Sequence, residues 1–290
     1  MPIINIGSIN IDHSYRLKHF VRPGETLACE QYRRGLGGKG MNQSIALQRA
    51  GAQVVHLGAV GRSDNWVRAA ISDAGVSCND LIESSTDTGH AIIQIDAAGE
   101  NCILLYAGAN HALSQADVNG VLQRYPQHRW VLTQNETNVV AHTIAQAVAS
   151  GRQVAFNPAP CQSALAELPL EQLALLLVNE VEACQLSNEG DLNQAYAALR
   201  RRCPATLVVL TLGAEGLWAA QRDQEWKVAA YPTHVVDTTG AGDTITGYLL
   251  AGLDAGLAVE PALHLAAKAA AITVSRPGAA ASIPMRAELN

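Results

Sequence analysis

Short apolar runs that alternate with helix-length amphipathic segments constrain the fold of this 290-residue chain more than any other feature. Apolar runs of this length, bounded by polar residues, are typical of buried strands, and the intervening segments show the 3.6-residue spacing of helices. Repeated strand, helix and strand predicts an α/β fold: a doubly wound, mostly parallel sheet with helices on both faces. The expected strands are residues 3–7, 54–60, 130–133, 154–157, 175–179 and 207–212, and the expected helices include residues 64–74, 115–125, 138–150 and 192–202.

Two stretches interrupt this alternation. Residues 12–34 surround the turn sequence RPGE, and residues 90–106 contain two apolar segments joined by AAGE. Both patterns are typical of antiparallel strand pairs. We expect a single domain over residues 1–290 whose two excursions form a small β-sheet lid.

Composition excludes several classes of protein. Hydrophobic residues make up 48% of the chain and charged residues 16%, which argues against a coiled coil or a disordered chain. The formal net charge is −6, and the basic residues form no long block, so nucleic acid is not an expected partner. No apolar run reaches the roughly 18 residues of a membrane span, and the first residues lack a secretion signal. We therefore expect a cytoplasmic protein with no membrane partner.

The segment DTTGAGDT, residues 237–244, is the most informative motif because it precedes an apolar helical run over residues 245–257. Small residues at a helix N-terminus let backbone N–H groups approach an anion, and the helix dipole adds positive potential there. Gly240, Ala241 and Gly242 would form this cradle for a phosphate. Asp243 would lie in the first turn, where a carboxylate can accept a proton from an attacking hydroxyl. The alternative is a simple helix cap beside a tight turn.

A second glycine-rich segment, GLGGKGMN over residues 35–42, precedes a helix expected over residues 43–50. Lys39 and Asn42 would offer hydrogen-bond donors to a hydroxyl-rich ligand. The spacing matches a dinucleotide-binding fingerprint, but no acidic residue follows about 20 positions on, and the segment does not follow the first core strand. It is not a Walker A loop either, because Gly40 stands where serine or threonine is required. A glycine turn without a ligand is the remaining alternative.

The first expected strand ends in GSINID, residues 7–12, with two polar side chains on one face. Asn10 and Asp12 are two residues apart, which is the period of a strand. Together they would hold vicinal hydroxyls, although an Asx turn that leads into the lid explains them as well.

These three segments together resemble the signatures of the PfkB-type carbohydrate kinases, and most closely those of the ribokinase branch. Further similar segments follow in the same order along the chain, so the resemblance covers essentially all of it. They are AGAN at 107–110, QNE at 134–136, NPAP at 157–160, NEVEA at 179–183, TLGAEG at 211–216 and SRPGA at 275–279.

The resemblance implies an ATP-dependent kinase with Asp243 as the catalytic base and Gly240, Ala241 and Gly242 as the anion hole. The implied sugar-binding residues are Asn10, Asp12, Gly38, Lys39, Asn42, Glu136 and Asp243. The implied nucleotide-binding residues are Asn179, Glu182, Thr211, Gly213, Gly216 and Gly242. Of these, Asn179 and Glu182 would organise Mg²⁺ and phosphate.

The resemblance also implies a monovalent-cation site, expected for K⁺, whose ligands are largely backbone carbonyls. Its residues would be Asp237, Thr239, Thr273, Arg276, Gly278 and Ser282. Simpler explanations stay open at some of these positions. Glu136 fits a polar strand end, Asn179 and Glu182 fit a capped helix start, and Arg276 fits a surface charge.

Five residues depart from the pattern of the family. Met41 and His90 stand where smaller or aliphatic residues are usual, which leaves the identity of the sugar open. Ile245 replaces a phenylalanine. Ala266 and Ala267 supply no polar group near the expected base pocket, so the nucleotide preference is open.

The expected reaction is therefore phosphorylation of a pentose, D-ribose at O5, by ATP. Other acceptors are 2-deoxyribose, a nucleoside or 2-keto-3-deoxygluconate, and a sugar-binding regulator without activity is a more distant alternative. A nicotinamide-dependent dehydrogenase is disfavoured by the missing acidic partner of the glycine fingerprint. Because exposed strand edges promote association, we expect a homodimer that pairs through the lids, residues 12–34 and 90–106.

Overall fold

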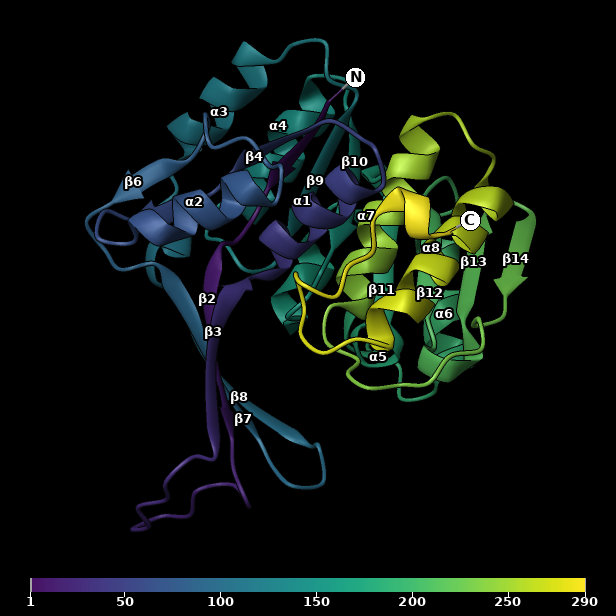
Figure 1. Ribbon diagram of the computed structural model, residues 1–290. Helices are drawn as coiled ribbons and strands as arrows, with labels where there is room; N and C mark the ends of the chain where they lie inside the picture. Colours follow the sequence, from purple (N-terminus) through teal and green to yellow (C-terminus); the bar gives the residue numbers. More distant parts are fainter. Residues whose placement is uncertain (1, 290) are drawn as a thin grey trace.

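The computed structural model describes residues 2–289, and its centre is an eight-stranded sheet (Figure 1). Six neighbouring strands are parallel, and two at one edge are antiparallel, so the predicted doubly wound α/β fold is confirmed. In spatial order the strands are β14 (Gln224–Val228), β13 (Leu217–Gln221), β12 (Leu207–Thr211), β11 (Leu175–Asn179), β10 (Gln153–Asn157), β9 (Trp130–Gln134), β1 (Ile3–Ile6) and β4 (Val54–Leu57).

Helices cover both faces of this sheet, and each face has its own core. In β1, for example, Ile3 packs into one core, whereas Ile4 and Ile6 pack into the other, as alternating strand side chains must. This two-sided burial explains why the strands are continuous apolar runs. One layer contains α1 (Lys39–Arg49), α2 (Asn65–Asp73), α7 (Ala241–Asp254) and α8 (Val259–Val274). The other contains α3 (Gln115–Arg124), α4 (Val140–Ala149), α5 (Glu180–Ser187) and α6 (Leu192–Arg202).

A separate four-stranded sheet projects from this body, as Figure 1 shows at lower left. Its strands, in spatial order, are β3 (Gln31–Gly37), β2 (Asn10–Arg16), β7 (Gly89–Ile95) and β8 (Asn101–Tyr106). β2 and β3 form one antiparallel pair and β7 and β8 another, and the two pairs join through parallel pairing of β2 with β7. The predicted small sheet is therefore present, and we call it the lid sheet.

The region predicted as one strand over residues 54–60 contains two strands in different sheets. β4 belongs to the main sheet, whereas β5 (Ala59–Gly61) pairs with β6 (Ile82–Ser84). The chain bends at Gly58, where an added Cβ would lie 2.6 Å from His56 Nε2 and 2.9 Å from the carbonyl oxygen of Gly7. The expected strands did not include the antiparallel pair β13–β14. The described part of the chain also contains five short 3-10 helices: η1 (Gly108–His111), η2 (Ser163–Glu167), η3 (Leu170–Gln172), η4 (Gly213–Glu215) and η5 (Arg286–Leu289).

Close packing of α1 against α7 brings their N-termini together at the edge where the parallel strands end. Gly247 of α7 makes this contact possible, because an added Cβ would lie 2.4 Å from Ala46 Cβ and 2.8 Å from the backbone nitrogen of Leu47. Ligands in open α/β sheets bind at this edge. The two glycine-rich motifs, about 200 residues apart in sequence, therefore lie next to each other.

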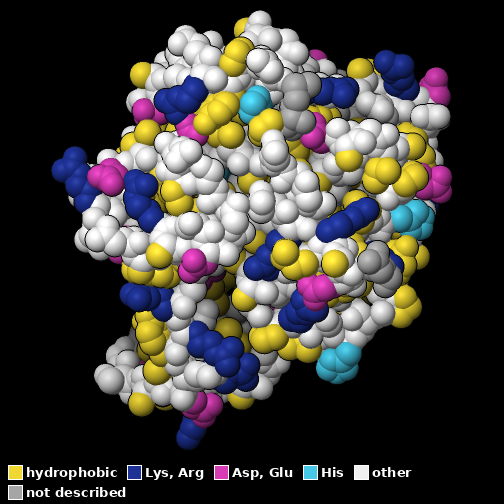
Figure 2. All heavy atoms as spheres, turned by 45° about the horizontal axis from the view of Figure 1, so that its top comes forward, with side chains coloured by type: hydrophobic (Ala, Val, Ile, Leu, Met, Phe, Trp, Pro, Cys, Tyr) yellow, Lys and Arg dark blue, Asp and Glu magenta, His cyan; other side chains and the backbone are white. Residues whose placement is uncertain are grey.

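The face of the molecule drawn in Figure 2 shows no large region of one charge. In the face drawn in Figure 2, Lys and Arg side chains lie among Asp, Glu and hydrophobic side chains. Across residues 2–289, every helix is too short or too polar to cross a lipid bilayer.

Candidate active site

Asp243 lies in the first turn of α7, as predicted, and its side chain is buried. Two amides from α1 hold its carboxylate. Asn42 Nδ2 donates to Oδ2 at 2.9 Å, and Gln43 Nε2 donates to Oδ1 at 2.9 Å. Burial raises the pKa of Asp243, although nearby Lys39 and these two amides partly offset the increase. A carboxylate of raised pKa that still has hydrogen-bond donors is suited to accept a proton.

The N-terminus of α7 opens onto empty space. Gly240 caps it with a left-handed backbone, φ 79°, which glycine adopts without strain. A Cβ built on Gly242 would meet nothing within 4 Å. The first amides of a helix have no partner within it, and they carry the positive end of the dipole. The predicted phosphate cradle thus has both the donors and the room that an anion needs.

The N-terminus of α1, in contrast, is closed by protein groups. Glu136 Oε2 accepts the backbone N–H of Lys39 at 2.9 Å and the hydroxyl of Ser8. Ser8 in turn accepts the N–H of Gly40 on Oγ at 3.1 Å and that of Met41 on its carbonyl at 2.9 Å. Glu136, predicted to bind sugar, is therefore also the residue that fixes this helix terminus. α1 begins at Lys39, four residues earlier than expected, because these partners satisfy its first amides.

Asn10 and Asp12 follow on β2, where this strand leaves the body for the lid sheet. Asn10 is buried, and its Oδ1 accepts Asn110 Nδ2 at 2.7 Å. Asn110 also accepts the backbone N–H of Ile9 at 2.8 Å, so it fixes the turn between β1 and β2. Our sequence analysis quoted Asn110 within a family-like segment but assigned it no role. Its position in the short η1 helix gave no indication of the contact with Asn10.

The charged groups around this site perturb one another. Burial, followed by the charges of Glu136 and Asp243, raises the pKa of Asp12 to about 7, and Lys39 opposes the shift. Burial alone would lower the pKa of Lys39, but Asp243, Glu136, Glu182 and Asp12 outweigh it and raise this pKa. One lysine thus faces four carboxyl groups, so the site is poised to bind neutral hydroxyls with charged acceptors and one strong donor.

A cavity of about 230 Å³ adjoins the carboxylate of Asp243 and the N-terminus of α7. It is lined by six predicted residues besides Asp243: Lys39, Asn179, Glu182, Thr211, Gly240 and Gly242. Asn179 caps α5 and accepts the N–H of Glu182 at 2.8 Å, while Glu182 accepts the N–H of Asn179 at 2.9 Å. Burial raises the pKa of Glu182, and the Asn179 N–H and Lys39 oppose it. The predicted capped helix start is thus present, and it also lines the cavity. Asn157, Thr238 and Thr246 line it too, although we had not singled them out.

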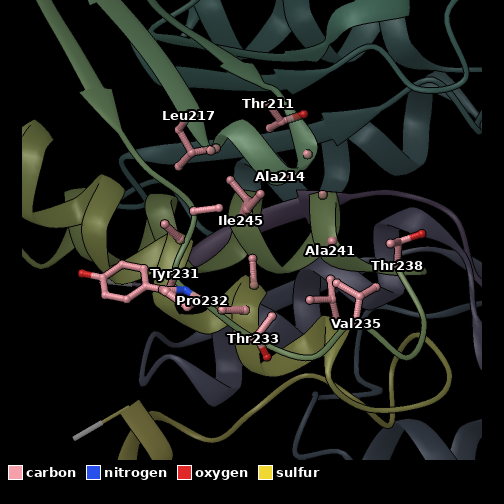
Figure 3. A pocket seen from close by; sticks show the side chains of 18 residues that line it. Thr211, Ala214, Leu217, Tyr231, Pro232, Thr233, Val235, Thr238, Ala241 and Ile245 are labelled. Carbon is pink, nitrogen blue, oxygen red and sulfur yellow. The ribbon is translucent and has the colours of Figure 1, made fainter.

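A second cavity, of about 440 Å³, lies on the other side of the α7 terminus (Figure 3). The two cavities share Thr211, Thr238 and Gly242 as lining residues, so they adjoin each other. Gly213 and Gly216 also line the larger one, as predicted for nucleotide-binding residues. The rest of its wall is mostly apolar, with Ala214, Leu217, Tyr231, Pro232, Val235, Ile245, Ala267, Ala270, Ala271 and Val274.

The residues of the predicted cation site lie in the loop before α7, at the C-terminal end of α8 and in the loop after it. Asp237 Oδ1 accepts the N–H of Thr239 at 2.9 Å, and Oδ2 accepts that of Gly278 at 2.8 Å. These bonds outweigh burial and lower the pKa of Asp237. Thr273 lies 3.0 Å from Thr244 Oγ1, measured between their hydroxyl oxygens. Two members are held by other contacts: Ser282 Oγ donates to the carbonyl of Ala279 at 2.7 Å, and Arg276 pairs with Glu288 at 2.5 Å.

The five departures from the family pattern occupy different environments. Met41 is fully buried in a core, not in either cavity. His90 lies on the face of the lid sheet opposite Asp12, with its ring centroid 5.9 Å from that of His13. Ala266 is buried in the same core as Met41, whereas Ala267 and Ile245 line the larger cavity.

Comparisons with known proteins agree with this geometry. A model of the pfkB family of carbohydrate kinases matches residues 3–286. A ribokinase from Haemophilus influenzae is 32% identical over 293 aligned positions, which cover 98% of this chain and 95% of that protein. A ribokinase from Cryptococcus neoformans, solved with ADP, has a TM-score of 0.83 and 32% identity and covers 99% of this chain and 98% of its own. A ribokinase from Arabidopsis thaliana, solved with ribose and ATP, has a TM-score of 0.88 and 25% identity, with 99% and 97% covered.

Proposed function

Because this chain belongs to the pfkB family of carbohydrate kinases, we propose that it transfers the γ-phosphoryl group of ATP to O5 of D-ribose. One observation carries the proposal: buried Asp243 lies between the polar groups of the lid-side strand and an open helix N-terminus that leads into a nucleotide-sized cavity. A base, an anion cradle and two adjoining binding spaces are the parts that phosphoryl transfer to an alcohol requires.

Asp243 acts as the general base. A sugar hydroxyl ionises poorly at neutral pH, so its proton must leave as the new bond forms. The O5 oxygen bonds to the γ-phosphorus, its proton passes to Asp243, and the bond from phosphorus to the bridging oxygen breaks to leave ADP. Asn10, Asp12, Gly38, Lys39, Asn42 and Glu136 hold the sugar so that O5 faces this carboxylate.

The first amides of α7, from Gly240 to Asp243, stabilise negative charge on the phosphoryl oxygens during transfer. Within residues 2–289 no group of three His, Cys, Asp or Glu side chains is arranged to hold a metal ion. Mg²⁺ usually binds through one or two protein ligands together with substrate phosphates, and the oxygens of Asn179 and Glu182 fit that requirement. When bound there, Mg²⁺ would neutralise charge on the phosphates.

We also propose a K⁺ site at the loops that contain Asp237 and Gly278. The contact of Asp237 with both Thr239 and Gly278 supports it, because this carboxylate ties the loop before α7 to the loop after α8. A cation bound by carbonyl oxygens of these loops would tighten the geometry of the phosphate cradle.

An ADP-release assay with Mg-ATP tests the proposal. The acceptors are D-ribose, 2-deoxyribose, fructose, ribonucleosides and 2-keto-3-deoxygluconate, each with K⁺ and with Na⁺. We expect turnover of ribose that increases with K⁺. Turnover of another acceptor alone would reject ribose but keep the kinase chemistry, and no turnover across the panel would favour a sugar-binding protein without activity.

We further propose a homodimer that pairs through the lid sheets, in the cytoplasm where ATP is available. All of β8 is exposed, and Ile103, Leu104 and Tyr106 are 53%, 67% and 47% exposed. β8 and β3 are also the edges of the lid sheet, and unprotected apolar edges favour association. Light scattering at micromolar concentration should give twice the chain mass of 30.6 kDa, whereas a monomeric mass would contradict the proposal.

A further inference from the structure

Next to Asp243 lies a hydrogen-bonded series of uncharged polar side chains that the proposed reaction does not use. All of its members are fully buried, with 0% of their surface exposed. They come from three strands and one helix of the body, and they are Asn5, Gln43, Ser44, His56 and Gln134. Burial of so many amides requires that each be hydrogen-bonded.

The chain runs continuously from the carboxylate to the histidine. Gln43 Nε2 donates to Asp243 Oδ1 at 2.9 Å, and Gln43 Oε1 accepts Gln134 Nε2 at 2.7 Å. Gln134 Nε2 also donates to Asn5 Oδ1 at 3.0 Å. Asn5 Nδ2 then donates to Ser44 Oγ at 2.8 Å and to the carbonyl of Gly40 at 2.7 Å, within α1.

The end of this series farthest from Asp243 sets the direction of its hydrogen bonds. Burial lowers the pKa of His56 to about 3, so this ring is neutral. Ser44 Oγ lies 2.8 Å from His56 Nδ1. The carbonyl of Gly40 can only accept, so it fixes the Asn5 amide with Nδ2 toward α1 and Oδ1 toward Gln134. Gln134 therefore directs its NH₂ group to Asn5 Oδ1 and to Gln43 Oε1, and Gln43 is left with its own NH₂ group for Asp243.

This direction matters because the side-chain amide of Gln43 has an acceptor oxygen and a donor NH₂ group, and either could be turned toward Asp243. With its oxygen held by Gln134, Gln43 can present only its NH₂ group to Asp243, and Asn157 Oδ1 accepts the same Nε2 at 3.1 Å. A reversed amide would place an oxygen against the carboxylate, and that contact is favourable only when the acid is protonated and no longer a base. Asn42 supplies the second donor, so each oxygen of Asp243 receives one amide.

One feature argues that the chain is not there for stability. Gln134 Oε1 is buried and has no hydrogen-bond partner among the described residues, which costs folding free energy. An apolar side chain at this position would avoid that cost. The amide is useful for its donor end, which is the end that reaches Gln43.

We propose that Gln134 and Gln43 are positioning residues that fix the orientation of the Asp243 carboxylate and present only hydrogen-bond donors to it. The inference rests on the proposed role of Asp243 as the base. Neither side chain touches either cavity, and neither was among the predicted site residues. The other charged groups that influence Asp243 are Lys39, Glu136, Asp12 and Glu182, and they are unchanged in the variants below.

Titration of Asp243 by carbon-13 NMR tests this directly, without substrate. The protein is labelled at aspartate carboxyl carbons, and the Asp243 signal is assigned by its loss in Asp243→Asn. We expect its pKa to rise in Gln43→Met, which removes the donor, and in Gln134→Met, which frees Gln43 to reverse. Exposed Gln146 in α4 provides the control, and Gln146→Met should titrate like the wild type.

Kinetics with the active acceptor give a second measurement. A one-unit rise in the pKa of the base predicts a loss of about tenfold in kcat at pH values below both pKa values, narrowing toward wild type at high pH. KM for the sugar should change less than about threefold. Two substituted positions are used because either variant alone is informative if the other does not fold.

The inference and the proposed function fail separately. If the folded variants titrate and respond to pH as the wild type does, the positioning role is wrong even when ribose is phosphorylated. If ribose is not a substrate but the Asp243 signal shifts as expected, the positioning role holds and the acceptor assignment is wrong.

Discussion

The N-termini of α1 and α7 follow similar glycine-rich sequences but have opposite environments. Both are capped by a glycine of positive φ, Gly38 at 89° and Gly240 at 79°. At α1, protein oxygens occupy the first amides, and an added Cβ on Gly40 would lie 2.3 Å from the backbone nitrogen of Ser8. At α7, an added Cβ on Gly242 would meet nothing. The same local signal therefore produces a closed joint in one place and an open anion site in the other.

This difference teaches that a glycine motif does not by itself identify a phosphate site. The α1 glycines let the segment after β1 pack directly on the helix. The α7 glycines leave room at the helix terminus, which the proposed reaction would use for the phosphates. What distinguishes them is whether other segments of the chain, here the two that contain Ser8 and Glu136, contact the amides of the terminus.

The largest effect on activity should come from Asp243, which lies in the first turn of α7 and is held by two amides of α1. Asp243→Asn keeps the shape of the side chain but removes the proton acceptor. We expect kcat to fall by at least about 100-fold, the low end for a positioned base, with little change in sugar binding. Steady-state kinetics and sugar titration measure the two effects. Asp73→Asn, on the exposed end of α2, is the control, and near wild-type kcat in Asp243→Asn would remove this residue from its role.

The closed terminus should be intolerant of a methyl group. In Gly40→Ala the new Cβ would overlap the backbone of Gly7 and Ser8, which cannot rotate away. We expect a loss of about 2–3 kcal/mol in the free energy of unfolding, or roughly 3–5 °C in Tm. Gly120→Ala, at an open position inside α3, should not destabilise the protein. Equal Tm values for both variants would show that the α1 joint is loose.

The open terminus should respond in the opposite manner. Gly242→Ala adds a methyl group where both cavities meet, so we expect Tm to stay the same or rise slightly, as helix propensity predicts. The methyl group would occupy space that the phosphates need, and kcat/KM for ATP should fall by about tenfold. Calorimetry and kinetics on the same preparation check this. Unchanged kcat/KM would mean that the phosphates do not approach this turn.

Much of this arrangement follows from the sequence, for identifiable reasons. The parallel strands are buried on both faces, so they are readable as apolar runs. Asp243 could be predicted as a site residue because Gly240 and Gly242 lie beside it in the sequence. Residues 54–60 were misread as one strand because the bend at Gly58 depends on contacts with Gly7 and Ile9, far away in sequence.

The support behind the site could not be predicted in this way. Gln43, Gln134 and Asn5 are ordinary polar residues next to motif residues, and nothing in their local sequence marks them as one chain. Their connection arises only when β1, β9 and α1 pack together. The same holds for Asn110, which fixes Asn10 from 100 positions away. Long-range hydrogen bonds of this kind leave no periodic signal in a single sequence.

The smallest expected effect is on stability and comes from Asp12, which lies on β2 in the proposed sugar-binding part of the site. Its pKa is about 7 in the folded protein, compared with 3.8 as the ordinary value. Between these pH values the folded state binds more protons than the unfolded state, so the group makes stability fall as pH rises through this window. Asp12→Asn removes the charge and hence this penalty. We expect its Tm to exceed that of the wild type by about 2–4 °C at pH 8, with a smaller difference at pH 5.

Calorimetry at the two pH values measures this gain, with exposed Asp223→Asn in the β13–β14 turn as the control. The same variant should bind sugar less well, because a neutral amide replaces a charged acceptor. A stability gain paired with weaker sugar binding would mean that the Asp12 carboxylate serves sugar binding although it lowers the stability of the folded protein. An equal Tm difference at both pH values would show that burial does not raise the pKa of Asp12. The surroundings of Asp12 would then be as accessible to water as the open N-terminus of α7.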